Sequence, residues 1–423
     1  MHDDEVIVVG GGLAGLVAAR HLADAGAAVT LFEREPAVGG RVRSTHEQGF
    51  TYDRGFQVLF TAYPAAQREL DYDALDLRSF TPGACICREG HRSILSDPFR
   101  DPGSLTESIF NRDVTVTDKL NTLRLKRELQ SRSTDSLFQG PDRSIEAYLD
   151  SRGFSRKYLE NFAAPFYGGI TLDRSLSTSK HVFEYTFKML SAGKTVVPAG
   201  GMGAISAQLR DRAEAAGATI QTDRPVEDVQ ADGDRVSVDL GGETVTADAV
   251  VVATDPAAAS SLTDVESIPT DAHSCVTQWY ALEDTGDLDA GKRLMLNAES
   301  DAPNQLVDHT IVAPEYAPDG TRLLSATFLG ERVESDEELA VLAHDTLASW
   351  YPERQFASFE LRHTDRIEFA QFEQPPGFAE TLPAARAPAG PVYLAGDYTR
   401  WSSIQGALES GKVAADAVRE DRQ

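Results

Sequence analysis

Near its N-terminus the 423-residue chain reads Val8-Val9-Gly10-Gly11-Gly12-Leu13-Ala14-Gly15, and this stretch decides the fold. Its glycines follow an apolar run from residue 5 to residue 9 and precede a helical pattern of apolar residues. We therefore expect a strand, a tight turn and a helix in this order. Gly10 would permit the turn, Gly12 would let the backbone approach a pyrophosphate, and Gly15 would let strand and helix pack closely.

A second apolar run, residues 28 to 32, ends on Glu33, which stands 18 positions after Gly15. An acid at about this spacing typically hydrogen-bonds the ribose of an adenine dinucleotide, and it disfavours a 2′-phosphate there. Leu13 and Ala14 at the helix start and Arg34 beside Glu33 complete the expected contacts. The segment thus predicts a dinucleotide site, but it does not choose between NAD and FAD.

Another glycine turn, Gly39-Gly40-Arg41, follows within eight positions of Glu33. It would lay flexible backbone and a guanidinium beside the same phosphates. An NAD dehydrogenase has no need of this second turn, so Gly39, Gly40 and Arg41 favour a flavin dinucleotide.

The C-terminal region also reads as a strand followed by a helix. Val392 to Ala395 is a short apolar run that ends on Gly396-Asp397, and Ser402 or Ser403 is the expected cap of a helix that begins near Ile404. The positive end of such a helix would stabilise negative charge on a reduced flavin.

With these motifs the chain resembles the flavin amine oxidase superfamily, which includes monoamine and polyamine oxidases, protoporphyrinogen oxidase and the carotenoid desaturases. Tyr52-Asp53-Arg54-Gly55-Phe56-Gln57 and Leu394-Ala395-Gly396-Asp397-Tyr398-Thr399 are most similar to the plant and cyanobacterial phytoene and zeta-carotene desaturases. Those enzymes commonly carry a histidine where this chain has Gln57.

The resemblance implies roles for several residues of this chain. Asp397 would accept a hydrogen bond from the ribityl chain of FAD, and the backbone of Val226 would contact adenine. Ala253, at the end of a further apolar strand, and Ser403 with Ile404 would belong to the same site. The FAD would be non-covalent, because no cysteine lies between Tyr398 and Gly406, where monoamine oxidases attach it.

The predicted fold class is α/β, with a Rossmann-like FAD-binding domain and a discontinuous α+β substrate domain of antiparallel sheet and helices. We expect residues 1–65, 195–262 and 385–423 in the FAD-binding domain, and 66–194 and 263–384 in the substrate-binding domain. Strands are predicted at 226–230, 276–282, 306–312 and 323–329, and a capping box at 335–338 predicts a helix that ends at Trp350.

Aromatic residues gather in one region, at Phe154, Tyr158, Phe162, Phe166 and Tyr167. We expect them to form a hydrophobic core, and an apolar substrate tunnel is the alternative. Tyr398 and Trp401 flank the flavin-facing turn and are the candidates for lining the site, with plain packing as their other role. No catalytic residue is assigned, because N5 of the flavin itself accepts hydride.

The composition limits partners and location. The net charge is −26, from 66 acidic and 40 basic residues, which argues against nucleic acid and anionic lipid as binding partners. This charge resembles that of proteins from salt-loving organisms. The three cysteines and nine histidines show no metal-ligand spacing, so we expect no metal. The chain has few cysteines, no signal peptide and no apolar run of 18 residues. We therefore expect a cytoplasmic protein without a transmembrane segment. Contact with the surface of a membrane is the alternative.

These observations predict an oxidoreductase that removes hydride from a hydrophobic, isoprenoid- or carotenoid-like small molecule, as a desaturase or dehydrogenase. A quinone or oxygen would then take the electrons. The alternatives are an amine oxidase, a protoporphyrinogen-type oxidase and, in another class, a non-enzymatic prenyl-lipid carrier. The carrier would require the flavin site to be empty.

Overall fold

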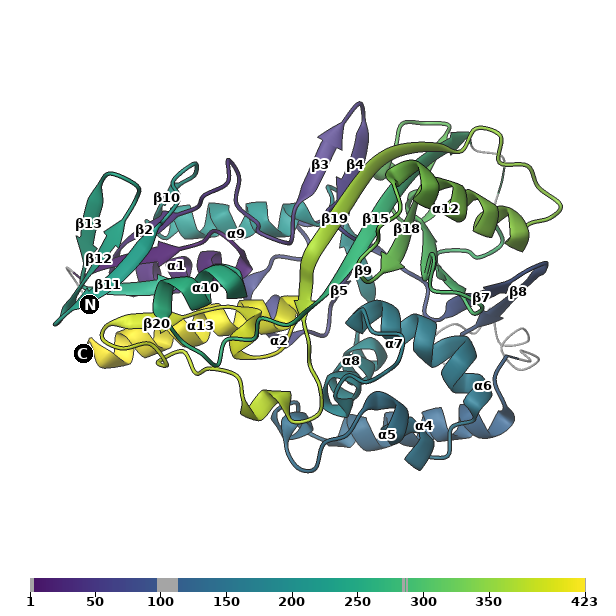
Figure 1. The fold of residues 1–423 in the computed structure, drawn as a ribbon, viewed down its shortest axis with the longest axis horizontal. Coiled ribbons are helices and arrows are strands. Elements are labelled where there is room, and N and C mark those ends of the chain that lie inside the picture. The colour runs from purple at the N-terminus through teal and green to yellow at the C-terminus, as the bar shows by residue number, and fades with distance from the viewer. Residues whose placement is uncertain (1–3, 97–112, 284–285, 287, 423) are drawn as a thin grey trace.

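A parallel five-stranded sheet, in the order β10-β2-β1-β14-β20, brings together the beginning, the middle and the end of the chain (Figure 1). The computed structural model describes residues 4–96, 113–283, 286 and 288–422. The sheet consists of β1 (Glu5–Val9), β2 (Ala28–Phe32), β10 (Thr219–Gln221), β14 (Ala249–Val252) and β20 (Val392–Leu394). The prediction of a Rossmann-like α/β fold is confirmed by this sheet and by the helices that cover it.

The two faces of the parallel sheet bury alternate residues of the same strands. Val6 and Val8 of β1 pack in the cluster that contains α1, whereas Ile7 and Val9 pack in the cluster that contains the antiparallel strands β11 to β13. The helices of this region are α1 (Leu13–Asp24), α9 (Gly203–Ala215), α10 (Pro256–Thr263) and α13 (Ile404–Asp421). The three antiparallel strands are β11 (Asp228–Asp232), β12 (Arg235–Asp239) and β13 (Thr244–Ala247). The strand predicted at 226–230 thus begins two residues later, and Val226 precedes it.

A second, seven-stranded sheet has the order β19-β15-β18-β17-β16-β7-β8. Its strands are β7 (Ala84–Arg88), β8 (His91–Leu95), β15 (Ala272–Glu283), β16 (Leu294–Asn297), β17 (Gln305–Asp308), β18 (Thr321–Leu329) and β19 (Glu360–Phe372). Helix α12 (Asp336–Trp350) packs against one face of this sheet. The Ser335–Glu338 capping box that starts α12 is confirmed, with Glu338 N donating to Ser335 Oγ at 3.2 Å and Ser335 N donating to the Glu338 carboxylate at 2.8 Å.

One predicted strand of this sheet is only partly right. The run from 306 to 312 is a strand as far as Asp308, where helix α11 (His309–Val312) begins. The side chain of Asp308 caps that helix by accepting a hydrogen bond from Ile311 N at 3.2 Å. A local capping interaction therefore overrides the β-branched and apolar pattern of this run.

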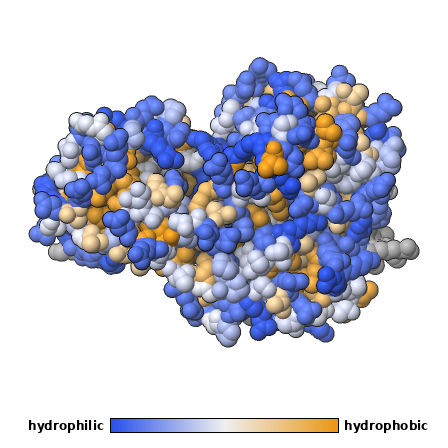
Figure 2. All heavy atoms as spheres, in the orientation of Figure 1, coloured by the Kyte–Doolittle hydropathy of each residue, from blue (hydrophilic) through white to orange (hydrophobic). Residues whose placement is uncertain are grey.

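Further helices and short strands lie outside the two large sheets, and most of these helices, α4 to α8, gather in one group (Figure 1). The helices are α2 (Pro64–Glu69), α4 (Val116–Ser131), α5 (Ile145–Ser151), α6 (Arg156–Tyr158), α7 (Ala164–Thr171) and α8 (Lys180–Ala192). The strands are β3 (Ser44–Glu47) with β4 (Phe50–Asp53), and β5 (Leu59–Phe60) and β6 (Leu77–Ser79) on either side of β9 (Thr195–Pro198). In the described ranges, no helix combines the length and the apolar character that a bilayer span needs. Most of the face seen in Figure 2 is hydrophilic.

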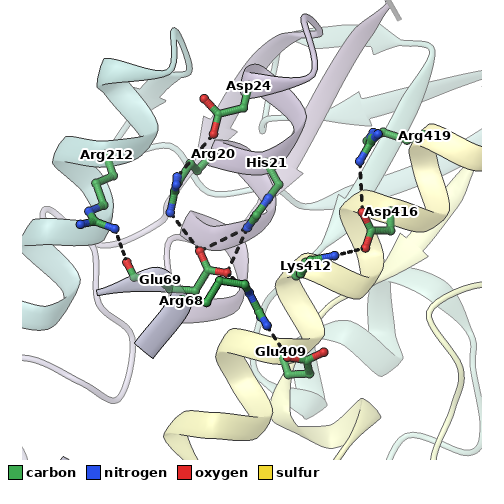
Figure 3. Close-up of polar contacts among 10 residues, drawn as sticks. All are labelled: Arg20, His21, Asp24, Arg68, Glu69, Arg212, Glu409, Lys412, Asp416 and Arg419. Atoms are coloured by element: carbon green, nitrogen blue, oxygen red, sulfur yellow. Dashed lines mark hydrogen bonds and ion pairs between the residues drawn. The ribbon is translucent and has the colours of Figure 1, made fainter. Parts of the chain in front are cut away.

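Polar contacts of Glu69 and its neighbour Arg68 link the four helices α1, α2, α9 and α13 (Figure 3). Glu69, at the end of α2, has no side-chain exposure, and its carboxylate lies 3.0 Å from Arg20 Nη1, 3.1 Å from His21 Nε2 and 2.6 Å from Arg68 Nε. Its backbone carbonyl accepts a hydrogen bond from Arg212 of α9, and Arg68 also reaches Glu409 of α13 at 2.9 Å. Burial opposes ionisation of Glu69, but the hydrogen bonds from His21 and Arg68 outweigh it and lower its pKa.

We predict that Glu69→Gln destabilises the fold by about 1–3 kcal/mol at pH 7, because cations that face one buried carboxylate lose their counter-charge. A carboxyl whose folded-state pKa is lowered adds stability above its unfolded pKa and loses it as pH falls through the folded value. The difference from the wild type should therefore shrink below about pH 4. Urea unfolding at several pH values measures both effects.

Asp24→Asn serves as the matched control. Asp24 pairs with the same Arg20 at 3.5 Å, but its side chain is 52% exposed, so this change should cost less than about 0.5 kcal/mol. Equal losses for the two variants, or a Glu69→Gln effect that does not depend on pH, would contradict the role assigned to Glu69.

Candidate functional site

A single cavity of about 1240 Å³ extends from the carboxyl ends of the parallel strands to the seven-stranded sheet. Its walls include the glycine turns of the N-terminal region, the segment after β20 and aromatic residues of the helical region. Ligand sites in open α/β sheets lie at the carboxyl ends of the strands, which is where this cavity begins.

The first glycine turn shapes one end of the cavity. Gly10 has φ +105°, and a Cβ there would lie 2.7 Å from the carbonyl oxygen of Ala253. A Cβ on Gly15 would lie 1.9 Å from Gly10 O, which confirms that Gly15 is needed for close packing. Gly12 differs, because no atom lies within 4 Å of its ideal Cβ and the residue lines the cavity. It caps α1 without a side-chain hydrogen bond, and Leu13 and Ala14 line the cavity beside it.

Glu33 lies at the end of β2 and is 7% exposed. One of its carboxylate oxygens accepts a hydrogen bond from Gly11 N at 2.6 Å, and the other accepts one from Glu35 N at 2.9 Å. Each oxygen keeps a second acceptor position, since a carboxylate offers about four in all. Arg34 also lines the cavity, where its guanidinium lies 3.4 Å from Asp255.

The second glycine turn meets the C-terminal segment at the cavity wall. Gly39 and Gly40 have φ +123° and +57°, values that L-residues with side chains rarely adopt. Arg41 follows them, and its Nη2 lies 2.7 Å from Asp397 Oδ1 while its Nη1 donates to Ala370 O at 2.9 Å. The fold thus joins two motifs that stand more than 350 residues apart in the chain.

Asp397 is 4% exposed, and its second oxygen accepts a hydrogen bond from Ser402 Oγ at 3.1 Å. Ser403 is the observed cap of α13, with its Oγ accepting from Gly406 N at 2.8 Å. Gly396, Ser403 and Ile404 all line the cavity. Helix α13 therefore begins at the cavity wall, as the sequence predicts.

Val226 and Ala253 line the same end of the cavity. The sequence did not single out Arg54 and Arg224, which also line it. Burial and the nearby charge of Arg43 lower the pKa of Arg54. Arg54 belongs to the segment from Tyr52 to Gln57, which resembles the desaturases. Its place in this segment could have identified Arg54 as a candidate site residue from the sequence.

The structure separates the two aromatic residues predicted to line the site. Trp401 lines the cavity and packs against Phe138 and Tyr185, with ring centroids 4.8 and 4.9 Å away. Tyr398 does not line it. Tyr398 belongs to the short helical turn over residues 397–399, and its side chain packs in the cluster between the parallel sheet and the strands β11 to β13. There it is fully buried, and its hydroxyl donates to Val252 O at 3.4 Å. Packing is thus the role of Tyr398.

The aromatic region belongs to the hydrophobic core and also forms a wall of the cavity. Tyr158, Phe162, Phe166 and Tyr167 line the cavity, and successive rings lie 5.1 to 5.4 Å apart. Phe154 packs on Tyr158 at 4.6 Å and does not line it. The expectation of a hydrophobic core is confirmed, because Phe154, Tyr158 and Tyr167 are core residues and Phe162 and Phe166 pack against this core. The tunnel alternative adds to it, since four of the five residues also line the cavity. Sequence periodicity identifies buried positions, but it does not distinguish a core from a chamber wall.

The chain is similar in sequence to several known proteins. The chain is 30% identical to a phytoene dehydrogenase of Streptomyces griseus over 280 residues, which cover 60% of this chain and 54% of that protein. It is 26% identical to a carotenoid 3,4-desaturase of Haloarcula japonica over 283 residues, which cover 60% of this chain and 56% of that protein. The matches thus span about half the length of these relatives.

The fold is also that of solved oxidases. A putrescine oxidase bound to putrescine superposes with a TM-score of 0.73, at 19% identity, over 99% of both chains. At this level of identity the likeness concerns the fold alone. The model of the flavin-containing amine oxidoreductases matches residues 13–419, nearly the whole chain, and the protein therefore belongs to this family.

Proposed function

We propose that this protein is a FAD-dependent oxidoreductase that removes hydride from an isoprenoid- or carotenoid-like substrate, acting as a desaturase or dehydrogenase. The observation that carries the proposal is the single cavity, which joins a glycine-lined nucleotide end to a chamber lined by aromatic side chains. Bound FAD would supply the hydride acceptor, which no side chain can provide. Either a quinone or oxygen would serve as the final electron acceptor.

The residues at the nucleotide end suit FAD. The open space in front of Gly12 at the start of α1 provides backbone N–H groups and a positive helix end for a pyrophosphate. Glu33 retains acceptor positions for ribose hydroxyls, although both oxygens already bind backbone N–H groups. Asp397 holds Arg41 in the wall of the cavity, and we assign to this pair the orientation of the ribityl and phosphate groups.

The chamber supports a hydrophobic substrate. Phe162, Phe166 and Tyr167, with Phe56 and Ile367 from other elements, present apolar surface to the cavity. Such walls exclude water and hold a long apolar chain through contact area. The Streptomyces and Haloarcula relatives, by their names, act on phytoene and on a carotenoid. These observations favour an isoprenoid over the amine and porphyrinogen alternatives.

The first test is the visible absorption spectrum of the purified protein in high salt. We expect the two visible bands of oxidised flavin, bleaching by dithionite, and release of intact FAD on heating, because the cofactor is non-covalent. Substrate screening then compares isoprenoids with amines. A colourless protein that cannot be reconstituted with FAD would contradict the proposal and leave the prenyl-lipid carrier.

Gly12→Val tests the pyrophosphate site. Gly12 has φ −72°, and its Cβ meets no neighbouring atom, so the variant should fold normally while its side chain enters the space assigned to the phosphates. We expect the Kd for FAD to rise at least tenfold, or about 1.4 kcal/mol, as measured by titration of the apoprotein. Gly200→Val is the control, because Gly200 is exposed and lies outside the cavity. Unchanged FAD affinity in Gly12→Val would refute the assignment.

The acidic composition supports a cytosol rich in salt as the site of action. Charges that give a net −26 repel one another, and salt screens this repulsion, with a Debye length of about 3 Å at 1 M. We therefore predict that the thermal midpoint rises steeply as KCl increases from millimolar to molar concentrations. A midpoint that does not respond to KCl would argue against a halophilic protein.

A further inference from the structure

A row of polar side chains crosses the cavity face of the seven-stranded sheet. Thr327 of β18 stands opposite Gln305 of β17 on one side and opposite Thr277 of β15 on the other, and Thr277 stands opposite Asp365 of β19. Side chains directly opposite on antiparallel strands have Cβ atoms about 5 Å apart. Of these four residues, Thr327 and Gln305 line the cavity, and this pair forms part of its floor.

The hydroxyl groups of this row have no protein partner. Thr277 is 0% exposed and Thr327 is 3% exposed, yet neither Oγ1 makes a hydrogen bond to any residue in the described ranges. Buried hydroxyls are normally paired, because leaving one unpaired costs stability. Thr327 lines the cavity, but its Oγ1 has almost no accessible surface, so a ligand would meet this hydroxyl only after rotation about χ1.

Gln305 is held so that its donor remains available. Asn304 donates from Nδ2 to Gln305 Oε1 and to Pro165 O, the latter at 2.9 Å, and Asn304 Oδ1 accepts from Arg174 Nη1 at 3.0 Å. Because Oε1 of Gln305 is engaged, its Nε2 is the group left for a ligand, and no described residue accepts from it. Gln305 is itself 2% exposed, so its amide is buried and rigidly oriented.

The polar pair stands where the aromatic wall reaches the sheet. An ideal Cβ on Gly169 of α7 would lie 3.2 Å from Gln305 Oε1, so the helix backbone approaches Gln305 closely. Phe166 and Tyr167 precede Gly169 on the same helix and line the cavity. The chamber is therefore apolar along its aromatic wall and offers a donor and a hydroxyl where this wall meets the sheet.

We propose that Gln305 and Thr327 form a subsite for an oxygen function, a hydroxyl or a carbonyl, on an otherwise apolar substrate. This rests on the proposed function, since it takes the chamber as the substrate cavity. A ligand oxygen accepts hydrogen bonds from Gln305 Nε2 and Thr327 Oγ1, and a ligand hydroxyl can instead donate to Thr327. A hydrocarbon leaves both groups unpaired, and a site built for a hydroxyl discriminates strongly against a ligand that lacks it.

The test compares geranylgeraniol with the hydrocarbon of the same chain that lacks its hydroxyl. Equilibrium binding to the FAD-loaded protein and to the apoprotein is followed by intrinsic fluorescence. We expect the alcohol to bind at least about tenfold more tightly, and Thr327→Val or Gln305→Leu to reduce this preference by about three- to tenfold. Thr327→Ser keeps the hydroxyl and should keep the preference.

Thr321→Val is the matched control, because it makes the same substitution in the same strand outside this cavity. Equal binding of alcohol and hydrocarbon by the wild type would overturn the subsite, since the row would then hold water. A preference that survives both Thr327→Val and Gln305→Leu would overturn it as well. If the protein binds FAD but shows no preference for the alcohol, only the subsite is refuted. If it prefers the alcohol but never binds FAD, the proposed function is refuted and the subsite stands.

Discussion

Close approach of backbones around α1 is the constraint on which the nucleotide end of the structure depends. A Cβ at Gly10 would lie 2.7 Å from Ala253 O, and a Cβ at Gly15 would lie 1.9 Å from Gly10 O. On the other side of the helix, a Cβ at Gly411 of α13 would lie 2.3 Å from Ala14 O. The absence of these side chains therefore lets α1 pack closely against both the parallel sheet and α13, with its N-terminus at the cavity.

This packing brings the two ends of the chain to the same wall. Once α13 lies on α1, Asp397 comes within 2.7 Å of Arg41, and the pair is largely shielded from water on the Asp397 side. The pair defines a polar region at one end of a cavity that becomes aromatic toward α7. Because the polar and the aromatic parts belong to one continuous space, the flavin ring and the apolar substrate that we propose would meet within it.

Local patterns predicted the elements that local forces determine. The glycine turns, Glu33, the Ser335–Glu338 capping box and the cap at Ser403 follow from short-range geometry and hydrogen bonds, and the structure contains them. Predictions that depended on direction or tertiary surroundings were less successful. The strand expected at 306–312 ends at a helix cap, and Tyr398 is buried against Val252 of β14 instead of lining the cavity.

The sequence by itself determined the dinucleotide-binding architecture, because glycine and acid at set spacings act through backbone geometry within one strand–turn–helix unit. Only the tertiary structure decided that Tyr158, Phe162, Phe166 and Tyr167 face a chamber, since burial in a core and burial around a cavity leave the same apolar pattern. It likewise brought Gln305, Thr327 and Thr277 into one row, because strand register is set by pairing between segments that are distant in the chain.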